Sequence, residues 1–139
     1  MTAADEIEQL RAVPMFAELD EDVLRRVALA AAPFEVKAGH VLVERGQPGS
    51  GMFVITEGTV EVLRRRGRTI TLGPGEFVGE LALLADVERV ARVRATTAVK
   101  GLAISRAAFG ELLREEPRIA VAMLPTLVRR LVAVESEQT

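Results

Sequence analysis

The stretch Met52-Phe53-Val54-Ile55-Thr56-Glu57-Gly58-Thr59-Val60 decides the fold that we expect for this chain. A run of β-branched and aromatic residues ends at a glycine and resumes after it, which predicts two short strands joined by a tight turn. Similar runs continue on both sides, and we expect strands near residues 34–37, 40–44, 52–57, 59–65, 68–72, 91–96 and 99–104. Glycine and proline separate these runs, as in turns that need a positive or preset φ. The pattern predicts an antiparallel β-roll of the jelly-roll, or double-stranded β-helix, type over residues 33–104.

Two helices are predicted before the roll. The first covers residues 2–12, where Thr2 and Asp5 stand at capping-box spacing. The second follows Asp20, a residue that favours the N-cap position, and reaches about residue 32. Leu19 and Leu24 stand at hydrophobic-staple spacing around that cap.

Two further helices are predicted after the roll. Ser105 can cap a helix that ends at Glu115, and Pro117 then starts the last helix. Pro125 lies inside that helix and predicts a kink or an interruption. Apolar residues recur at spacings of three and four, and we expect them to pack on their own domain, with pairing to a second copy as the alternative. This stripe consists of Ala120, Leu124, Leu127, Leu131 and Val134.

Length and composition fit one mainly β domain with flanking helices. With 139 residues, 49% hydrophobic and 27% charged, the chain can bury a single sizeable core. We expect one domain over 1–139, with N-terminal helices in 1–32, the roll in 33–104 and C-terminal helices in 105–136. Sixteen arginines against two lysines favour a bacterial origin.

Charge and hydropathy limit the partners. A net charge of −2 argues against general attraction to nucleic acid or anionic membranes, which favour a basic excess. The sequence has no cysteine, no signal-peptide pattern and no apolar run of about 18 residues. We therefore expect a soluble cytoplasmic protein without a membrane segment.

The stretch from Gly79 to Ala95 carries the candidate binding site. Gly79 allows the backbone to approach an anion closely, and the first N–H groups of a short helix predicted from Glu80 to Leu83 would point at that anion. Arg89 offers a planar fork of donors for two phosphate oxygens, while Glu80 can accept a hydrogen bond from a ribose hydroxyl. These residue types predict a pocket for a small sugar-phosphate. A permanent ion pair between Arg89 and Glu80 is the alternative.

These residues resemble the phosphate-binding cassette of cyclic-nucleotide-binding domains, which occur in catabolite activator proteins, cyclic-AMP-dependent kinase regulatory subunits and cyclic-nucleotide-gated channels. The matching runs are Phe77-Val78-Gly79-Glu80-Leu81-Ala82-Leu83 and Glu88-Arg89-Val90-Ala91. The resemblance covers nearly the whole chain and implies a cassette over 77–91. It implies that Arg89 grips a cyclic phosphate and that Glu80 binds the ribose 2′-hydroxyl. The residues implied as backbone contacts or walls are Gly79, Leu81, Ala82, Val90 and Ala91.

The resemblance also implies a regulatory mechanism. The last helix would close over the ligand as a lid, with Arg129 and Arg130 placed to reach the base, and would signal to a protein partner in trans. The implied ligand is cyclic AMP, with cyclic GMP as the second candidate. Val90 departs from the family's Ser or Thr, which disfavours cyclic GMP and weakens binding by about 1 kcal/mol, the size of one hydrogen bond. The alternatives are an interaction scaffold that binds no nucleotide and a different ligand in the same pocket.

Enzyme functions find little support. His40 is the only histidine, so neither a cupin-like metal site nor a Ser-His-Asp triad can be assembled from the usual residues. We expect no catalysis, no metal and no cofactor apart from the regulatory ligand. The activator family reads DNA through a helix-turn-helix that follows the last helix, and this sequence ends at Thr139, so we expect no direct DNA binding.

Overall fold

Eight short strands account for the alternating central region of the sequence. The structure, a computed structural model, describes residues 3–44, 46, 51–64, 68–79 and 91–138, with side chains described to residue 133. The strands in this part of the chain are β1 (Ala31–Val36), β2 (Val41–Val43), β3 (Gly51–Glu57), β4 (Val60–Arg64), β5 (Ile70–Leu72), β6 (Phe77–Val78), β7 (Ala91–Ala95) and β8 (Val99–Ser105). They form two antiparallel sheets in the orders β1-β8-β3-β6 and β2-β7-β4-β5. The expected mainly β roll with flanking helices is confirmed.

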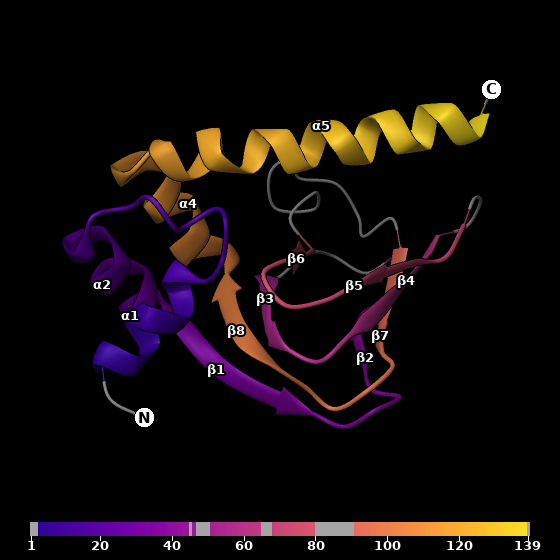
Figure 1. The fold of residues 1–139 in the computed structure, drawn as a ribbon, viewed down its shortest axis with the longest axis horizontal. Coiled ribbons are helices and arrows are strands. Elements are labelled where there is room, and N and C mark those ends of the chain that lie inside the picture. The colour runs from indigo at the N-terminus through magenta and orange to yellow at the C-terminus, as the bar shows by residue number, and fades with distance from the viewer. Residues whose placement is uncertain (1–2, 45, 47–50, 65–67, 80–90, 139) are drawn as a thin grey trace.

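Four helices flank the sheets in the described residues: α1 (Ala3–Arg11), α2 (Glu21–Ala30), α4 (Arg106–Glu115) and α5 (Arg118–Gln138). Helices α1, α2 and α4 gather at one end of the molecule and the strands at the other, while α5 extends along both (Figure 1). Among the described residues, no helix combines the length and apolar character that a membrane span requires.

The apolar residues form two cores, one on each face of the β1-β8-β3-β6 sheet. The core between the two sheets contains Ile55, Val60 and Val99, which are fully buried. The other core lies between the first sheet and the helices, and it contains Leu24 of α2 and Met52 of β3. Alternate residues of β3 therefore serve different cores, because successive side chains of a strand point to opposite faces.

A glycine in the middle of β8 makes room for an aromatic pair. Gly101 pairs with Phe34 on β1 and with Ile55 on β3. The rings of Phe34 and Phe53 meet edge to face, with centroids 5.4 Å apart and an interplanar angle of 76°. A Cβ on Gly101 would lie 2.8 Å from Cε1 of Phe34 and would also collide with the carbonyl oxygen of Val54. Close packing thus explains a glycine inside this strand.

Helix boundaries follow the expected caps with two corrections. The hydroxyl of Ser105 accepts a hydrogen bond from the Ala108 N–H at 3.2 Å, so this predicted N-cap is confirmed. Asp20 occupies the N-cap of α2, but its side chain makes no capping hydrogen bond. The helix also ends at Ala30 rather than near residue 32, because Ala31 already pairs with Ile104 of β8. Thr2, half of the first predicted capping box, lies outside the described residues.

The predicted apolar stripe of α5 is only partly correct: Leu127 packs against the core, but other residues of the stripe do not. Ile119 and Met123 are buried against the core, whereas Leu124 and Leu131 of the predicted stripe are exposed. Two faces of this helix are apolar, so periodicity alone does not select the one that packs. Pro125 interrupts nothing, since α5 is continuous from Arg118 to Gln138. Val134, the last residue of the stripe, has no described side chain.

Candidate functional site

A short edge strand leads into the candidate site. The strand β6 consists of Phe77 and Val78, both buried, which pair with Val54 and Phe53 of β3. The sequence did not predict this strand, because two residues inside the cassette motif are too few to show an alternating pattern. Gly79 follows with a φ of +89°, a conformation that L side chains rarely adopt. Glycine is therefore required at the entrance of the candidate site for a reason of backbone geometry.

The other end of the site lies in the second sheet. Ala91 is the first residue of β7, is buried and pairs with Arg64 of β4. Residues 80–90 therefore connect β6 of one sheet to β7 of the other. These residues include five of the predicted site residues, and all five lie outside the described part of the chain: Glu80, Leu81, Ala82, Arg89 and Val90.

The arginines of β7 point away from the core between the sheets. Ala91, Val93 and Ala95 are buried, whereas Arg92 and Arg94 are exposed between them. Arg92 forms an ion pair with Glu44 at 2.9 Å, and Arg94 forms one with Glu61 of β4. Both side chains thus have carboxylate partners on the outer face of the sheet.

Arg130 brings α5 to the entrance of the site. Its Nη2 donates a hydrogen bond to the carbonyl oxygen of Phe77 at 2.6 Å, and its guanidinium carbon lies 4.7 Å from the centroid of the Phe77 ring. Phe77 precedes Gly79 by two residues. The structure therefore places three predicted site residues, Gly79, Ala91 and Arg130, on β6, β7 and α5 or directly beside them. The sequence singled out Arg130 as a residue near the ligand but did not predict its contact with Phe77.

A second charged cluster lies at the joint between α4 and α5. Arg118 binds both carboxylate oxygens of Glu116, at 2.5 and 3.0 Å, and approaches Asp20 at 3.6 Å. The hydrogen bond from the Arg118 side chain lowers the pKa of the Glu116 carboxyl below its ordinary value. The same bond raises the pKa of the Arg118 guanidinium. Asp20 therefore faces this joint instead of capping its own helix.

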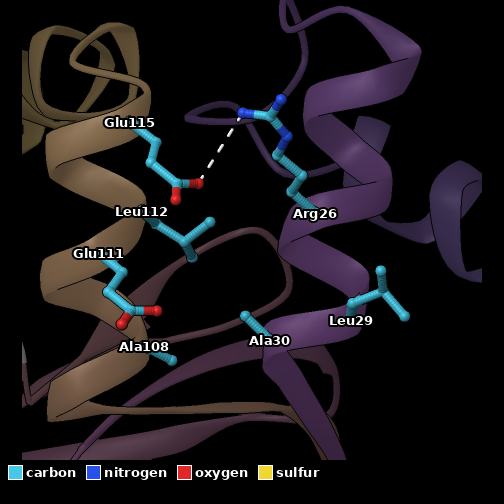
Figure 2. A pocket seen from close by; sticks show the side chains of 7 residues that line it. All are labelled: Arg26, Leu29, Ala30, Ala108, Glu111, Leu112 and Glu115. Carbon is cyan, nitrogen blue, oxygen red and sulfur yellow. Dashed lines mark ion pairs between the residues drawn. The ribbon is translucent and has the colours of Figure 1, made fainter.

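A small cavity of about 240 Å³ lies elsewhere, between α2 and α4. Arg26 of α2 and Glu115 of α4 form an ion pair across it at 3.8 Å (Figure 2). The residues that line it are Arg26, Leu29, Ala30, Ala108, Glu111, Leu112 and Glu115, none of which belongs to the predicted site. Within the described part of the chain, no group of three His, Cys, Asp or Glu residues could hold a metal ion.

The family model of the cyclic nucleotide-binding domain matches residues 33–116, which run from within β1 through the rest of the roll, including the connection between β6 and β7, to the end of α4. The chain belongs to the cyclic nucleotide-binding domain family. The resemblance read from the cassette motif is thus confirmed at the level of the family.

Other members of the cyclic nucleotide-binding domain family are similar over most of this chain. A cyclic nucleotide-gated potassium channel of Mesorhizobium japonicum is 38% identical over 125 residues, which are 90% of this chain and 35% of the channel. The structure of the Thermus thermophilus catabolite activator protein has a TM-score of 0.78 and 27% identity, covering 90% of this chain and 61% of that one. The chain spans between 27% and 35% of the length of three related potassium channels.

A further similar solved structure is that of a kinase regulatory subunit bound to guanosine. A Trypanosoma cruzi regulatory subunit of a cAMP-independent protein kinase A, bound to guanosine, has a TM-score of 0.78 and 31% identity to this chain. The similarity covers 87% of this chain and 44% of that subunit.

Proposed function

We propose that this domain is a regulatory sensor that binds cyclic AMP at the connection between β6 and β7. The observation that carries the proposal is the positive φ of Gly79 directly after β6, at the start of a cassette motif that lies inside the family match. A backbone in this conformation allows an anion to approach N–H groups closely. Ala91, buried at the start of β7, would form a wall of the same pocket.

The ligand contacts follow from the residue types in the connection. Arg89 would hold two oxygens of the cyclic phosphate with its planar fork, and Glu80 would accept a hydrogen bond from the ribose 2′-hydroxyl. The remaining walls would come from Leu81, Ala82 and Val90. Because the side chain of Val90 has no hydroxyl, it cannot bind a guanine amino group, which favours cyclic AMP over cyclic GMP.

The last helix would act as the output element. Arg130 already brings α5 against β6 beside the entrance of the pocket. A ligand that binds more tightly when α5 is closed would shift the helix toward the closed position, by the difference in its affinities for the two states. We propose that this shift reaches a protein partner through the exposed face of α5.

The exposed face of α5 favours a second copy of the same chain as that partner. Val121, Leu124, Val128 and Leu131 are each more than half exposed and follow one another at spacings of three, four and three. This is the spacing of a coiled-coil seam, in which identical helices bury identical stripes. We name this set of four residues the α5 ridge.

Calorimetric titration of nucleotide-stripped protein with cyclic AMP, cyclic GMP and guanosine tests the function. We expect one-site binding of cyclic AMP that Arg89→Ala abolishes and Arg92→Ala preserves. Arg92 is the matched control because it lies three residues away on the outer face, paired with Glu44. Ligand at about 100 times its dissociation constant should add roughly 2.7 kcal/mol to the free energy of unfolding.

The controls separate the competing functions. No heat and no thermal shift with any of the three compounds at millimolar concentration would rule out the sensor function and favour the scaffold. In a scaffold, Arg89 would serve an internal ion pair, and Arg89→Ala would lower stability without any ligand. Binding of guanosine alone would assign a different ligand to the same pocket.

A further inference from the structure

The packed face of α5 ends at an arginine. Ile119 and Met123 are buried and Leu127 is partly buried in the core between the helices and the first sheet. Arg130 follows on the same face, eleven residues after Ile119, which corresponds to three turns of the helix. The next three described side chains, residues 131–133, are exposed. Arg130 therefore stands where the packed part of α5 gives way to the exposed part.

Arg130 contacts Phe77 in two ways, through the backbone carbonyl oxygen and through the aromatic ring. The guanidinium donates to the Phe77 carbonyl oxygen at 2.6 Å and lies over the Phe77 ring at 4.7 Å. A planar guanidinium can combine a hydrogen bond with stacking on an aromatic face, whereas a lysine ammonium is a point charge. Because the hydrogen bond goes to a main-chain oxygen, a shift of the β6 backbone would move the acceptor of Arg130. A shift of the Phe77 ring would likewise move its stacking partner.

Phe77 connects this contact to the proposed binding site. Its ring is buried in the core, and its backbone reaches Gly79 through Val78 alone. The strand β6 is an edge strand that pairs with β3 through Phe53 with Val78 and Val54 with Phe77, and Gly75 and Glu76 just before it form two more backbone hydrogen bonds with Ile55 of β3. Among the described strands, β6 is paired on one side only, so it can shift at lower cost than the central strands, which are paired on both sides. A displacement at Gly79 would therefore reach Phe77 directly.

We propose that Arg130 is a positioning residue that couples the backbone entering the binding site to α5. When the backbone at Gly79 moves on ligand binding, Phe77 carries its carbonyl and ring along, and Arg130 passes the shift to the end of the packed face of α5. The proposal rests on the proposed function, but its first part, the attachment of α5 to β6, holds in the free protein as well. It assigns to Arg130 a role in transmission that is separate from any contact with the ligand.

Amide hydrogen exchange along α5, with and without saturating cyclic AMP, tests this coupling. Arg130→Met keeps the aliphatic stem but removes the charge and all donors. Arg129→Met is the matched control, because Arg129 is exposed and donates to Thr126 of its own helix at 3.2 Å. Arg130→Lys keeps the charge and loses the planar fork. Calorimetry on each variant measures affinity independently of the exchange readout.

In the free protein, we expect the second half of α5 to exchange about tenfold faster in Arg130→Met than in the wild type, as for loss of one charge-assisted hydrogen bond. Arg129→Met should match the wild type, and Arg130→Lys should fall between. At saturating cyclic AMP, α5 exchange should change in the wild type and in Arg129→Met but stay unchanged in Arg130→Met.

Two results would overturn the coupling. One is an Arg130→Met variant whose α5 responds to saturating ligand as the wild type does, even if its affinity is lower, because Arg130 would then be a ligand contact only. The other is wild-type exchange in the free Arg130→Met protein, which would show that the contact does not hold α5. Failure of the wild type to bind cyclic AMP would instead refute the proposed function. The amide exchange of the free wild type and the free Arg130→Met protein would still show whether Arg130 attaches α5 to β6.

Discussion

At the residue scale, Gly101 shows how one missing side chain fixes the packing of the roll. We expect Gly101→Ala to lower the free energy of unfolding by roughly 1–3 kcal/mol, as overpacked cores do. The added Cβ would collide with the Val54 carbonyl and with the Phe34 ring. Urea denaturation measures the loss. Gly73→Ala is the control, because there the nearest heavy atom to an added Cβ lies at 3.8 Å. Equal stabilities of the two variants would contradict this account.

Residues whose structure depends on neighbours in the sequence were predicted better than residues that contact distant segments. Gly79 could be singled out from the sequence as the glycine that opens the cassette, and the structure gives it a φ of +89°, a local backbone feature that a glycine can indicate. The Ser105 cap is equally local and was predicted correctly. Asp20 failed as a capping side chain because Arg118, almost a hundred residues away, lies within 3.6 Å of it. The contact of Arg130 with Phe77 was missed for the same reason, since it joins distant segments.

At the scale of elements, the joint between α4 and α5 predicts a dependence of stability on pH. The folded Glu116 carboxyl has a pKa below its ordinary value near 4.5, chiefly because it accepts a hydrogen bond from Arg118. Below that value, the unfolded chain binds a proton that the folded chain resists, so acidification lowers the free energy of unfolding. The contribution is fully present above the unfolded pKa and is lost as the pH falls through the folded pKa.

Urea denaturation between pH 7 and pH 3 in the wild type and in Arg118→Met measures this contribution. We expect the variant to lose less stability on acidification below about pH 4.5, because its Glu116 no longer has the hydrogen bond that lowers the pKa. Glu111→Gln, an exposed residue of α4 away from the joint, is the control and should follow the wild-type curve. Identical pH slopes in the wild type and in Arg118→Met would show that the joint does not contribute.

Pro125 gives a second prediction at this scale. A proline inside a helix has no N–H to donate to the carbonyl four residues earlier, here that of Val121. Its side chain is exposed, so Pro125→Ala removes no packing. We expect α5 to be stabilised by roughly 1–3 kcal/mol, seen as slower amide exchange along the helix. Unchanged or faster exchange would mean that α5 needs the proline for its present shape.

The elements themselves were predictable to the extent that their pattern was unambiguous. The seven strands expected from alternating runs all appear, because period-two alternation and turn residues agreed at each of them. The strand β6 was missed because two residues are too few to show a period. The packed face of α5 was assigned correctly at Leu127 but wrongly at Leu124 and Leu131, because this helix contains consecutive apolar residues and only tertiary contacts distinguish its faces.

At the scale of the whole molecule, the α5 ridge predicts self-association. The four aliphatic side chains of the ridge are each more than half exposed and leave apolar area in water that a second copy could bury. We expect a dimer by size-exclusion chromatography with light scattering, and a monomer after Leu124→Glu combined with Leu131→Glu. Because a dimer unfolds with a concentration-dependent midpoint, the wild-type melting temperature should rise with protein concentration, while that of the double variant should not.

The control for self-association is another exposed leucine. Leu29 of α2 is 88% exposed but lies outside the α5 ridge, so Leu29→Glu should leave the dimer intact. If Leu29→Glu also gives a monomer, the interface includes α2 and the ridge alone does not define it. A wild type that is monomeric at high concentration would leave the ridge to a different protein and would remove the second copy as the receiver of the signal from α5. A dimer that only the ridge substitutions disrupt would place the interface on the same helix that Arg130 attaches to β6. Any effect of ligand binding on dimerisation would then be matched by an equal effect of dimerisation on ligand affinity.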